Sequence, residues 1–142
     1  MKFLEDKVKI AVRFSEVDAM GVVWHGNYLK FFEDGRESFG NKKGLSYLDV
    51  YDKGFFTPIV KTSLQYRSPI YFGDEIEVRS RLERSKAAKI IFNYEIWNIT
   101  KNILSADGSS VQVFLNKDSR EMELLQPLFY REWINKMDWR EE

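Results

Sequence analysis

The segment from Asp18 to Tyr28 holds the residue types best suited to chemistry in this chain. Asp18 is an isolated carboxylate before an apolar turn, and that turn leads into an aromatic stretch with helical spacing. Valine and tryptophan side chains around Asp18 would exclude water and make its carboxylate more basic. Free N–H groups at a helix start can stabilise negative charge on a substrate oxygen. This combination suits the hydrolysis of an activated acyl group.

Thioesters fit such a site because resonance protects their carbonyl weakly and the leaving thiolate derives from a thiol with a pKa of about 8.5. One carboxylate and backbone donors therefore suffice. Simpler interpretations stay open at this point. Asp18 can be a turn residue that hydrogen-bonds toward Met20 or Gly21, and His25, the only histidine, can be structural.

Other site chemistries lack their residues. The chain has no cysteine, which excludes disulfides, thiolate metal sites and cysteine nucleophiles. His25 has no carboxylate four residues away, so no metal site is expected. The serine-elbow and dinucleotide glycine patterns are absent, and Asn27-Tyr28 replaces the Lys-Ser/Thr of a phosphate loop. We expect neither a metal nor a cofactor.

Length and charge set further bounds. The 142 residues include 22 basic and 22 acidic side chains, and 44% of all residues are hydrophobic. This predicts one globular domain over residues 1–142, with 120–142 as a C-terminal helical extension. The balanced charge argues against a nucleic-acid partner. No signal peptide or membrane-spanning stretch of about 18–20 apolar residues is visible, so we expect a cytoplasmic protein without a membrane partner.

Hydrophobic spacing predicts a strand over 8–14, a turn-like run over 15–26, and a helix over 27–40 that Asn27 caps and Gly40 ends. The segment 44–54 reads as a short helix or loop. Further predicted elements are strands at 57–67, 75–82, 89–97 and 103–115, a bulge at Asp107-Gly108, and a C-terminal helix over 124–137 with Leu125, Leu128, Phe129 and Trp133 as its apolar side. Successive strands with one long helix indicate an antiparallel α+β domain.

Two motifs resemble a known family. The sequence VDAMGVVWHGNY (17–28), followed by FFE (31–33) and RE (36–37), resembles the signature of the 4-hydroxybenzoyl-CoA thioesterase family of hotdog-fold proteins. The stretch 66–78 is similar too and marks a turn into a long strand, and the resemblance covers roughly residues 5–120. It implies a hotdog fold, with an antiparallel sheet of about five strands wrapped around the long central helix, and acyl-CoA thioesterase activity.

The resemblance also implies roles for single residues. Asp18 would be the catalytic nucleophile or the general base for water. A backbone N–H at or near His25 would polarise the thioester carbonyl, and the His25 side chain would orient the thioester. Trp24 and Tyr28 are candidates for the acyl pocket, although they can equally belong to the core.

Three basic residues are candidates for the carrier site. In the family, coenzyme A often binds basic side chains at the turn between the two long strands, where this chain has Arg84, Lys86 and Lys89. They can pair with the nucleotide phosphates or form an ordinary solvated turn.

The family pairs the open sheet edge of two subunits, so the resemblance implies a homodimer or homotetramer with active sites at the seam. Three alternatives stay open. The carrier can be an acyl carrier protein instead of coenzyme A. The enzyme can be a hydratase or dehydratase that uses His25 and Glu33, which would lie about 12 Å apart on one helix face. The protein can also be a non-enzymatic acyl-ligand binding module.

Overall fold

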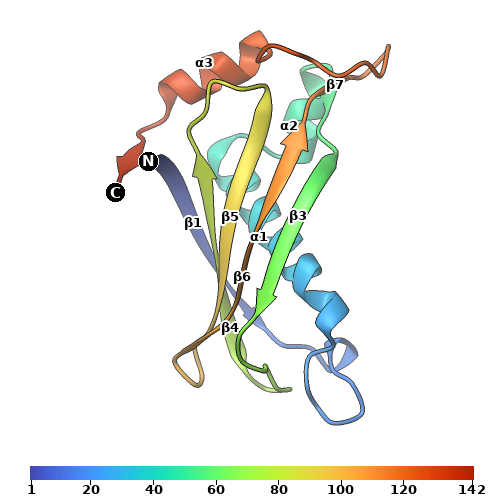
Figure 1. Cartoon of the computed structure of the whole chain (residues 1–142), viewed down its shortest axis with the longest axis vertical. Coiled ribbons are helices and arrows are strands. Elements are labelled where there is room, and N and C mark those ends of the chain that lie inside the picture. Colours follow the sequence, from blue (N-terminus) through green and yellow to red (C-terminus); the bar gives the residue numbers. More distant parts are fainter.

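The computed structural model describes every residue from Met1 to Glu142. Its main sheet has six antiparallel strands in the order β3-β6-β5-β4-β1-β8 (Figure 1). These strands are β1 (Lys2–Ala11), β3 (Ile59–Tyr66), β4 (Glu75–Glu83), β5 (Lys89–Asn98), β6 (Ile103–Val113) and β8 (Arg140–Glu141). Because β8 has only two residues, five long strands form the sheet, as the sequence predicts.

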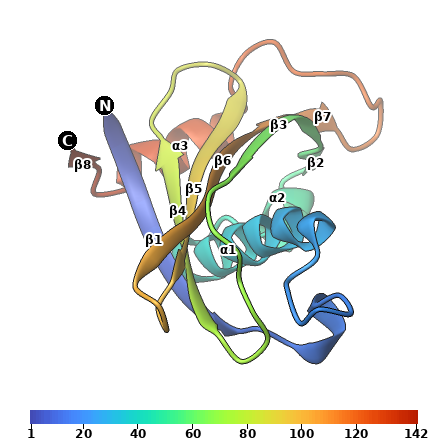
Figure 2. The same ribbon diagram turned by 60° about the horizontal axis from the view of Figure 1, so that its bottom comes forward.

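Three helices accompany the sheet. They are α1 (Tyr28–Lys43), α2 (Tyr47–Asp52) and α3 (Leu128–Lys136), with short 3-10 turns η1 (Phe14–Glu16) and η2 (His25–Asn27) before α1 and a separate ribbon of β2 (Phe55–Phe56) and β7 (Leu115–Asn116). The sheet curves around α1, which lies against its concave face (Figure 2). The predicted α+β arrangement of a sheet around one long helix is confirmed. None of the helices is both long and apolar enough to cross a membrane.

Aromatic side chains at helical spacing bury α1 against the sheet. Phe32 and Phe39 are at most 1% exposed, and Phe32 stacks on Tyr94 of β5 with ring centroids 4.4 Å apart. Gly35 lets the helix approach β4 closely, because a Cβ at this position would lie 2.8 Å from Cγ1 of Val78. The long helix is therefore held in one position on the sheet.

The predicted N-terminal end of this helix is confirmed, because Asn27 holds the N-cap position, and the predicted C-terminal end is wrong. Gly40 lies inside α1, where a Cβ would lie 2.6 Å from the carbonyl oxygen of Leu45, and Gly44 ends the helix with a φ of +74°. Asn27 makes no side-chain cap, and its backbone is already helical, with φ −82° and ψ −12°. Its Nδ2 donates to the carbonyl oxygen of Glu16. The Asn27 side chain thus ties the start of α1 to the preceding loop and does not cap the helix.

The first strand differs from its predicted range of 8–14. β1 starts at Lys2 and pairs with β4 from Phe3 to Ala11. Acidic residues hide its alternation in the sequence, because Asp6 lies buried and accepts hydrogen bonds from Ser38 and Lys42 of α1. The strand ends before Val12, and the chain then enters η1.

The bulge in β6 lies two residues before the predicted Asp107-Gly108. The pairing with β5 shifts at Ser105, whereas Gly108 keeps regular partners on both sides. Gly108 serves a close approach instead, since a Cβ there would lie 2.8 Å from Cε2 of Phe32. The glycine marks packing of α1 on the sheet and not a pairing irregularity.

The C-terminal helix α3 is shorter than the predicted 124–137, because Pro127 precedes its first residue. Leu125 and Leu128 are 77% and 65% exposed, so they do not form its apolar side. Tyr130 and Trp133 are buried there, and the Trp133 Nε1–H donates to the carbonyl oxygen of Lys43 at 2.7 Å. α3 therefore packs on the end of α1.

β3 forms the open edge of the sheet. It pairs only with β6, and every residue in it except Leu64 is exposed. Ile59, Val60 and Tyr66 are 41%, 59% and 53% exposed. An exposed edge strand of this kind presents unpaired backbone groups to a further strand.

Candidate active site

The loop between β1 and α1 (residues 12–27) is organised around Glu16. Its side chain is 1% exposed and accepts hydrogen bonds from the Arg13 backbone N–H at 2.7 Å and the Arg13 guanidinium at 3.0 Å, with Lys30 of α1 at 3.4 Å. Burial favours a raised pKa for Glu16, but the hydrogen bonds and charge of Arg13, with the charge of Lys30, hold the pKa below its usual range. Glu16 is therefore a buried carboxylate that stays ionised.

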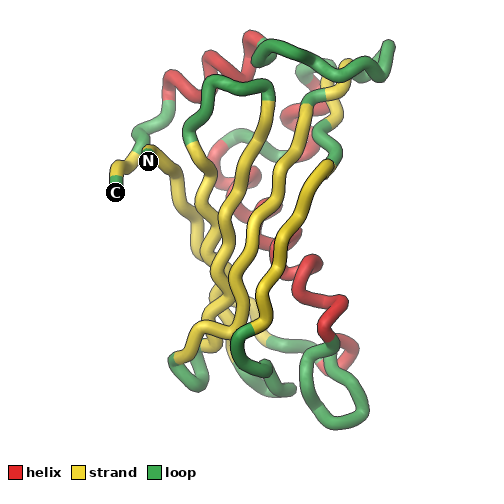
Figure 3. Tube along the Cα trace, in the orientation of Figure 1, coloured by secondary structure: helices red, strands yellow, loops and turns green.

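Glu16 also joins the two ends of this loop through its backbone. Its carbonyl oxygen accepts the Trp24 N–H at 3.0 Å and the Asn27 Nδ2–H at 2.8 Å. The start of α1 is thus fixed to the end of η1. Figure 3 shows the loop in green at the end of the sheet where α1 begins.

Asp18 lies in the tight turn of this loop. Its Oδ1 accepts the backbone N–H of Met20 at 2.9 Å and of Val22 at 3.2 Å, and Gly21 adopts a φ of +76°. The turn interaction that the sequence leaves open is therefore present. The second carboxylate oxygen, Oδ2, makes no hydrogen bond within the chain.

The expected exclusion of water around Asp18 is not found within one chain. Val23 is buried, but Asp18 is exposed and Trp24 is 52% exposed. Neighbouring side chains of the same chain therefore leave the carboxylate open to solvent.

The turn between β3 and β4 holds this loop from its other side. The Val23 N–H donates to the carbonyl oxygen of Ile70 at 2.8 Å, and the Phe72 N–H donates to that of Gly21 at 2.9 Å. Asp74 closes the turn. Burial favours a raised pKa for Asp74, but hydrogen bonds from Tyr71, Asn98 and Lys101 keep the pKa below its usual range. The second motif (66–78) thus holds the first motif (17–28) in position.

Two backbone N–H groups just before the start of α1 have no hydrogen-bond partner. Neither the His25 nor the Gly26 N–H has an acceptor within the chain. The Trp24 ring lies over Gly26, where a Cβ would meet Cε3 at 2.6 Å, and the Tyr66 hydroxyl donates to the His25 carbonyl oxygen at 2.9 Å. These contacts fix the peptide units whose N–H groups can bind a developing oxyanion.

The side chains of His25 and Tyr28 lie in different surroundings. The His25 ring is exposed and sits 4.9 Å from the Trp24 ring and 6.5 Å from that of Tyr66. Tyr28 is 4% exposed and packs in the core, where burial and then the neighbouring Tyr66 raise its pKa. Tyr28 thus lies in the core position that the sequence leaves open for it, whereas Trp24 remains at the surface.

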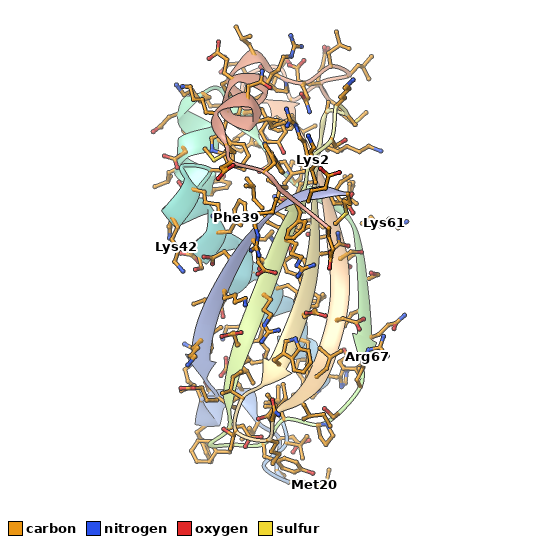
Figure 4. The ribbon with its side chains drawn as sticks, turned by 90° about the vertical axis from the view of Figure 1, so that its left-hand side faces the viewer. Lys2, Met20, Phe39, Lys42, Lys61 and Arg67 are labelled. Carbon is orange, nitrogen blue, oxygen red and sulfur yellow. The ribbon has the colours of Figure 1, made fainter.

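The basic candidates gather at the other end of the sheet. Arg84 and Lys86 line a hollow of about 570 Å³ together with Lys2 and with Arg131 of α3, whereas Lys89 lies outside it. Figure 4 shows Lys2 and Met20 toward opposite ends of the sheet. One chain therefore does not bring the basic turn and the Asp18 loop together.

The arrangement includes residues that sequence reasoning missed. Glu16 follows Arg13 at the i, i+3 spacing of a 3-10 turn, and Asp74 follows Gly73, which has a φ of +90°. Both spacings are visible in the sequence as local turn signals. Tyr66 carried no signal of its own, because its contact with His25 joins residues 41 positions apart. No group of three His, Asp or Glu side chains is arranged to hold a metal ion.

Comparison with known proteins identifies the family. Residues 12–138 match the profile of the thioesterase-like superfamily. The chain belongs to this superfamily. YneP of Bacillus subtilis, a protein provisionally named as an acyl-CoA thioesterase, is 33% identical over 113 residues, which cover 80% of this chain and 81% of the relative. The predicted family is thereby confirmed.

The chain is also similar to two further thioesterases. The acyl-acyl carrier protein thioesterase ATL3 of Arabidopsis thaliana is 25% identical over 118 residues, covering 83% of this chain and 62% of that protein. The solved DHNA-CoA thioesterase of Staphylococcus aureus is 28% identical with a TM-score of 0.82, covering 93% of this chain and 89% of that one. The predicted hotdog fold is confirmed.

Proposed function

We propose that this member of the thioesterase-like superfamily hydrolyses an acyl-CoA thioester to a free carboxylic acid and coenzyme A. Family membership supports thioester hydrolysis as the reaction class. The roles of single residues rest on one observation: the same loop holds a carboxylate oxygen and two backbone donors that have no partner. These are Oδ2 of Asp18 and the N–H groups of His25 and Gly26.

In the general-base route, the Asp18 carboxylate takes a proton from water while the water oxygen bonds to the thioester carbon. The carbonyl electron pair moves to its oxygen, which the N–H groups at His25 and Gly26 stabilise. Collapse breaks the carbon–sulfur bond, and the departing thiolate receives the proton from Asp18. In the alternative route, Oδ2 attacks the carbon itself, the carbon–sulfur bond breaks and coenzyme A leaves as its thiolate, which leaves a mixed anhydride on Asp18. Water then hydrolyses this anhydride to the free carboxylic acid and the Asp18 carboxylate, and the released proton goes to the thiolate.

A second copy of the chain would complete the site. The β3 edge is exposed and carries unpaired backbone groups, so two copies can join their sheets through antiparallel β3 strands about a two-fold axis. That pairing sets the Tyr66 end of one β3 beside the Ile59 end of the other. Because Tyr66 contacts His25, the Asp18 loop of each copy would then be covered by its neighbour. We propose a homodimer at least, and a tetramer can arise from two such dimers.

The same assembly supports the carrier site. Within one chain, β4 alone spans about 30 Å between the Asp18 end and the hollow with Arg84 and Lys86. In the β3-paired dimer, the hollow of one copy lies at the same end as the Asp18 loop of the other. We therefore propose that the phosphates of coenzyme A bind there, with Lys89 on the adjoining strand. We also propose that the enzyme acts in the cytoplasm.

A hydrolysis screen tests this function. The purified chain is given short, medium, long and aromatic acyl-CoAs, and the matching acyl carrier protein thioesters, while released thiol is measured. The expected result is thiol release from at least one acyl-CoA, with weaker turnover of the carrier protein series. Thiol release from no thioester would contradict the proposal, and water addition to an enoyl-CoA would indicate a hydratase instead. Light scattering that shows only a 16.9 kDa species would exclude the dimer.

A further inference from the structure

The peptide unit that joins His25 to Gly26 is hydrogen-bonded at one end only. Its carbonyl oxygen, that of His25, accepts two donors: the Tyr28 N–H at the start of α1 and the Tyr66 hydroxyl at 2.9 Å. Its N–H, that of Gly26, has no acceptor within the chain. Because linked hydrogen bonds polarise one another, a donor at the carbonyl oxygen strengthens the N–H of the same amide. The Gly26 N–H is therefore strengthened as a donor toward an oxygen from outside the chain.

The neighbouring peptide unit, which joins Trp24 to His25, differs. Its carbonyl oxygen accepts the backbone N–H of Asn27 at 2.9 Å, and no side chain donates to it. The Trp24 ring also covers one side of Gly26, since a Cβ at that position would lie 2.6 Å from Cε3. Of the two free N–H groups, only that of Gly26 thus belongs to a peptide unit that a side chain from the sheet supports.

The sheet holds Tyr66 in place. Tyr66 is the last residue of β3, where it pairs with Ala106 of β6. Its ring packs edge-on against the ring of the buried Tyr28, with centroids 4.9 Å apart, and lies 6.5 Å from the His25 ring. The hydroxyl therefore connects the main sheet to the loop, and its position does not depend on the backbone hydrogen bonds of η2.

We propose that Tyr66 is a positioning residue of the thioesterase reaction, which aligns and polarises this peptide unit so that the Gly26 N–H binds the developing oxyanion. This inference rests on the proposed thioesterase function. The thioester oxygen gains its negative charge only as water or Asp18 attacks the carbon. A stronger donor therefore stabilises the transition state more than the bound thioester. Tyr66 should accordingly act on kcat and not on KM.

Tyr66→Phe tests this role, because it removes the hydroxyl and keeps the ring against Tyr28. Loss of a whole oxyanion donor lowers kcat by roughly 100- to 1,000-fold. Here the Gly26 N–H remains, and water can partly replace the hydroxyl because Tyr66 is 53% exposed. We therefore expect kcat to fall about 3- to 10-fold, with KM within about twofold of the wild type.

The matched control is Tyr47→Phe, which removes a hydroxyl from another exposed tyrosine. Tyr47 is 62% exposed and begins α2, which lies toward the opposite end of the sheet from the Asp18 loop (Figure 1). This variant should keep the wild-type kcat and KM.

An infrared measurement separates the proposed role from a merely structural one. The Asp18→Asn variant is given the acyl-CoA that the wild type hydrolyses, isotopically labelled at its thioester carbonyl. A hydrogen bond to the carbonyl oxygen lowers the stretching frequency of the bound thioester relative to the free one. Adding Tyr66→Phe to this variant should make that lowering smaller, whereas adding Tyr47→Phe should leave it unchanged.

The outcomes distinguish this inference from the proposed function. Wild-type kcat in Tyr66→Phe, or a loss confined to KM, overturns the inference and leaves the thioesterase function intact. A lower kcat with an unchanged carbonyl frequency also overturns it, because Tyr66 would then act without changing the donor. Turnover of no thioester by the wild type refutes the proposed function, and the inference with it.

Discussion

Replacing Glu16 with glutamine should loosen the loop that carries Asp18. The carboxylate is 1% exposed and holds three donors, from the Arg13 backbone, the Arg13 guanidinium and Lys30. A glutamine has nearly the same size, but it is neutral and its amide N–H₂ would face these donors. The substitution therefore removes charge and leaves donors unsatisfied without opening a cavity.

The expected cost follows from these contacts. Removing one partner of a buried ion pair costs about 3–5 kcal/mol. The Arg13 and Lys30 side chains are 58% and 48% exposed, so water recovers part of this loss and we expect about 2 kcal/mol. For a chain of this length a loss of that size lowers Tm by about 7 °C.

Thermal unfolding followed by circular dichroism measures this difference. The matched control is Glu121→Gln, because Glu121 is exposed and forms no ion pair, so its Tm should stay within about 2 °C of the wild type. Thiol release should fall in Glu16→Gln and not in the control. A Glu16→Gln variant that melts with the wild type would refute the view that this buried ion cluster holds the loop.

Three other predictions follow from the same structure. The pKa values of Glu16 and Asp74 lie below their usual range in the folded protein. The two carboxylates therefore stabilise the fold above about pH 4.5, and this stabilisation is lost as the pH falls through their folded pKa values. Tm should drop on acidification, and it should drop less steeply in Glu16→Gln. Gly35→Ala should cost about 1–3 kcal/mol in chemical denaturation, because the new Cβ meets β4, and a neutral effect would contradict the close approach. Replacing Arg84 and Lys86 with Met should raise KM for acyl-CoA several-fold with little change in kcat, whereas a change confined to kcat would exclude them from carrier binding.

Much of the fold could be predicted because local patterns and tertiary structure agree. The alternation in β4 and β5 and the aromatic spacing of α1 give the right elements within a few residues. Some failures have a tertiary cause. Gly108 and Asn27 carry strong local signals, but each serves a contact with a distant segment, which no local pattern reveals, whereas Gly40 lies where the chain folds back closely at Leu45, just beyond the end of α1.

In the candidate site, too, the features set by local sequence could be predicted and those that need contacts between distant segments could not. The Asp18 turn and the free amides near His25 follow from one continuous motif. The ion cluster of Glu16 needs Lys30, and the support of His25 needs Tyr66 of β3, so both depend on how α1 and the sheet meet. The exposure of Asp18 could not be predicted either, because it depends on how the loop folds against the rest of the chain; in the proposed dimer a neighbour at the β3 edge would cover it.

Single-turnover hydrolysis by Asp18→Asn tests the central claim most directly. The asparagine Oδ1 can still accept the Met20 and Val22 N–H groups, so the turn and the Tm should be preserved. The account predicts that the rate constant for thioester cleavage falls by at least about 100-fold at unchanged substrate binding. Cleavage at the wild-type rate by this folded variant, across every acyl-CoA that the wild type hydrolyses, would contradict it.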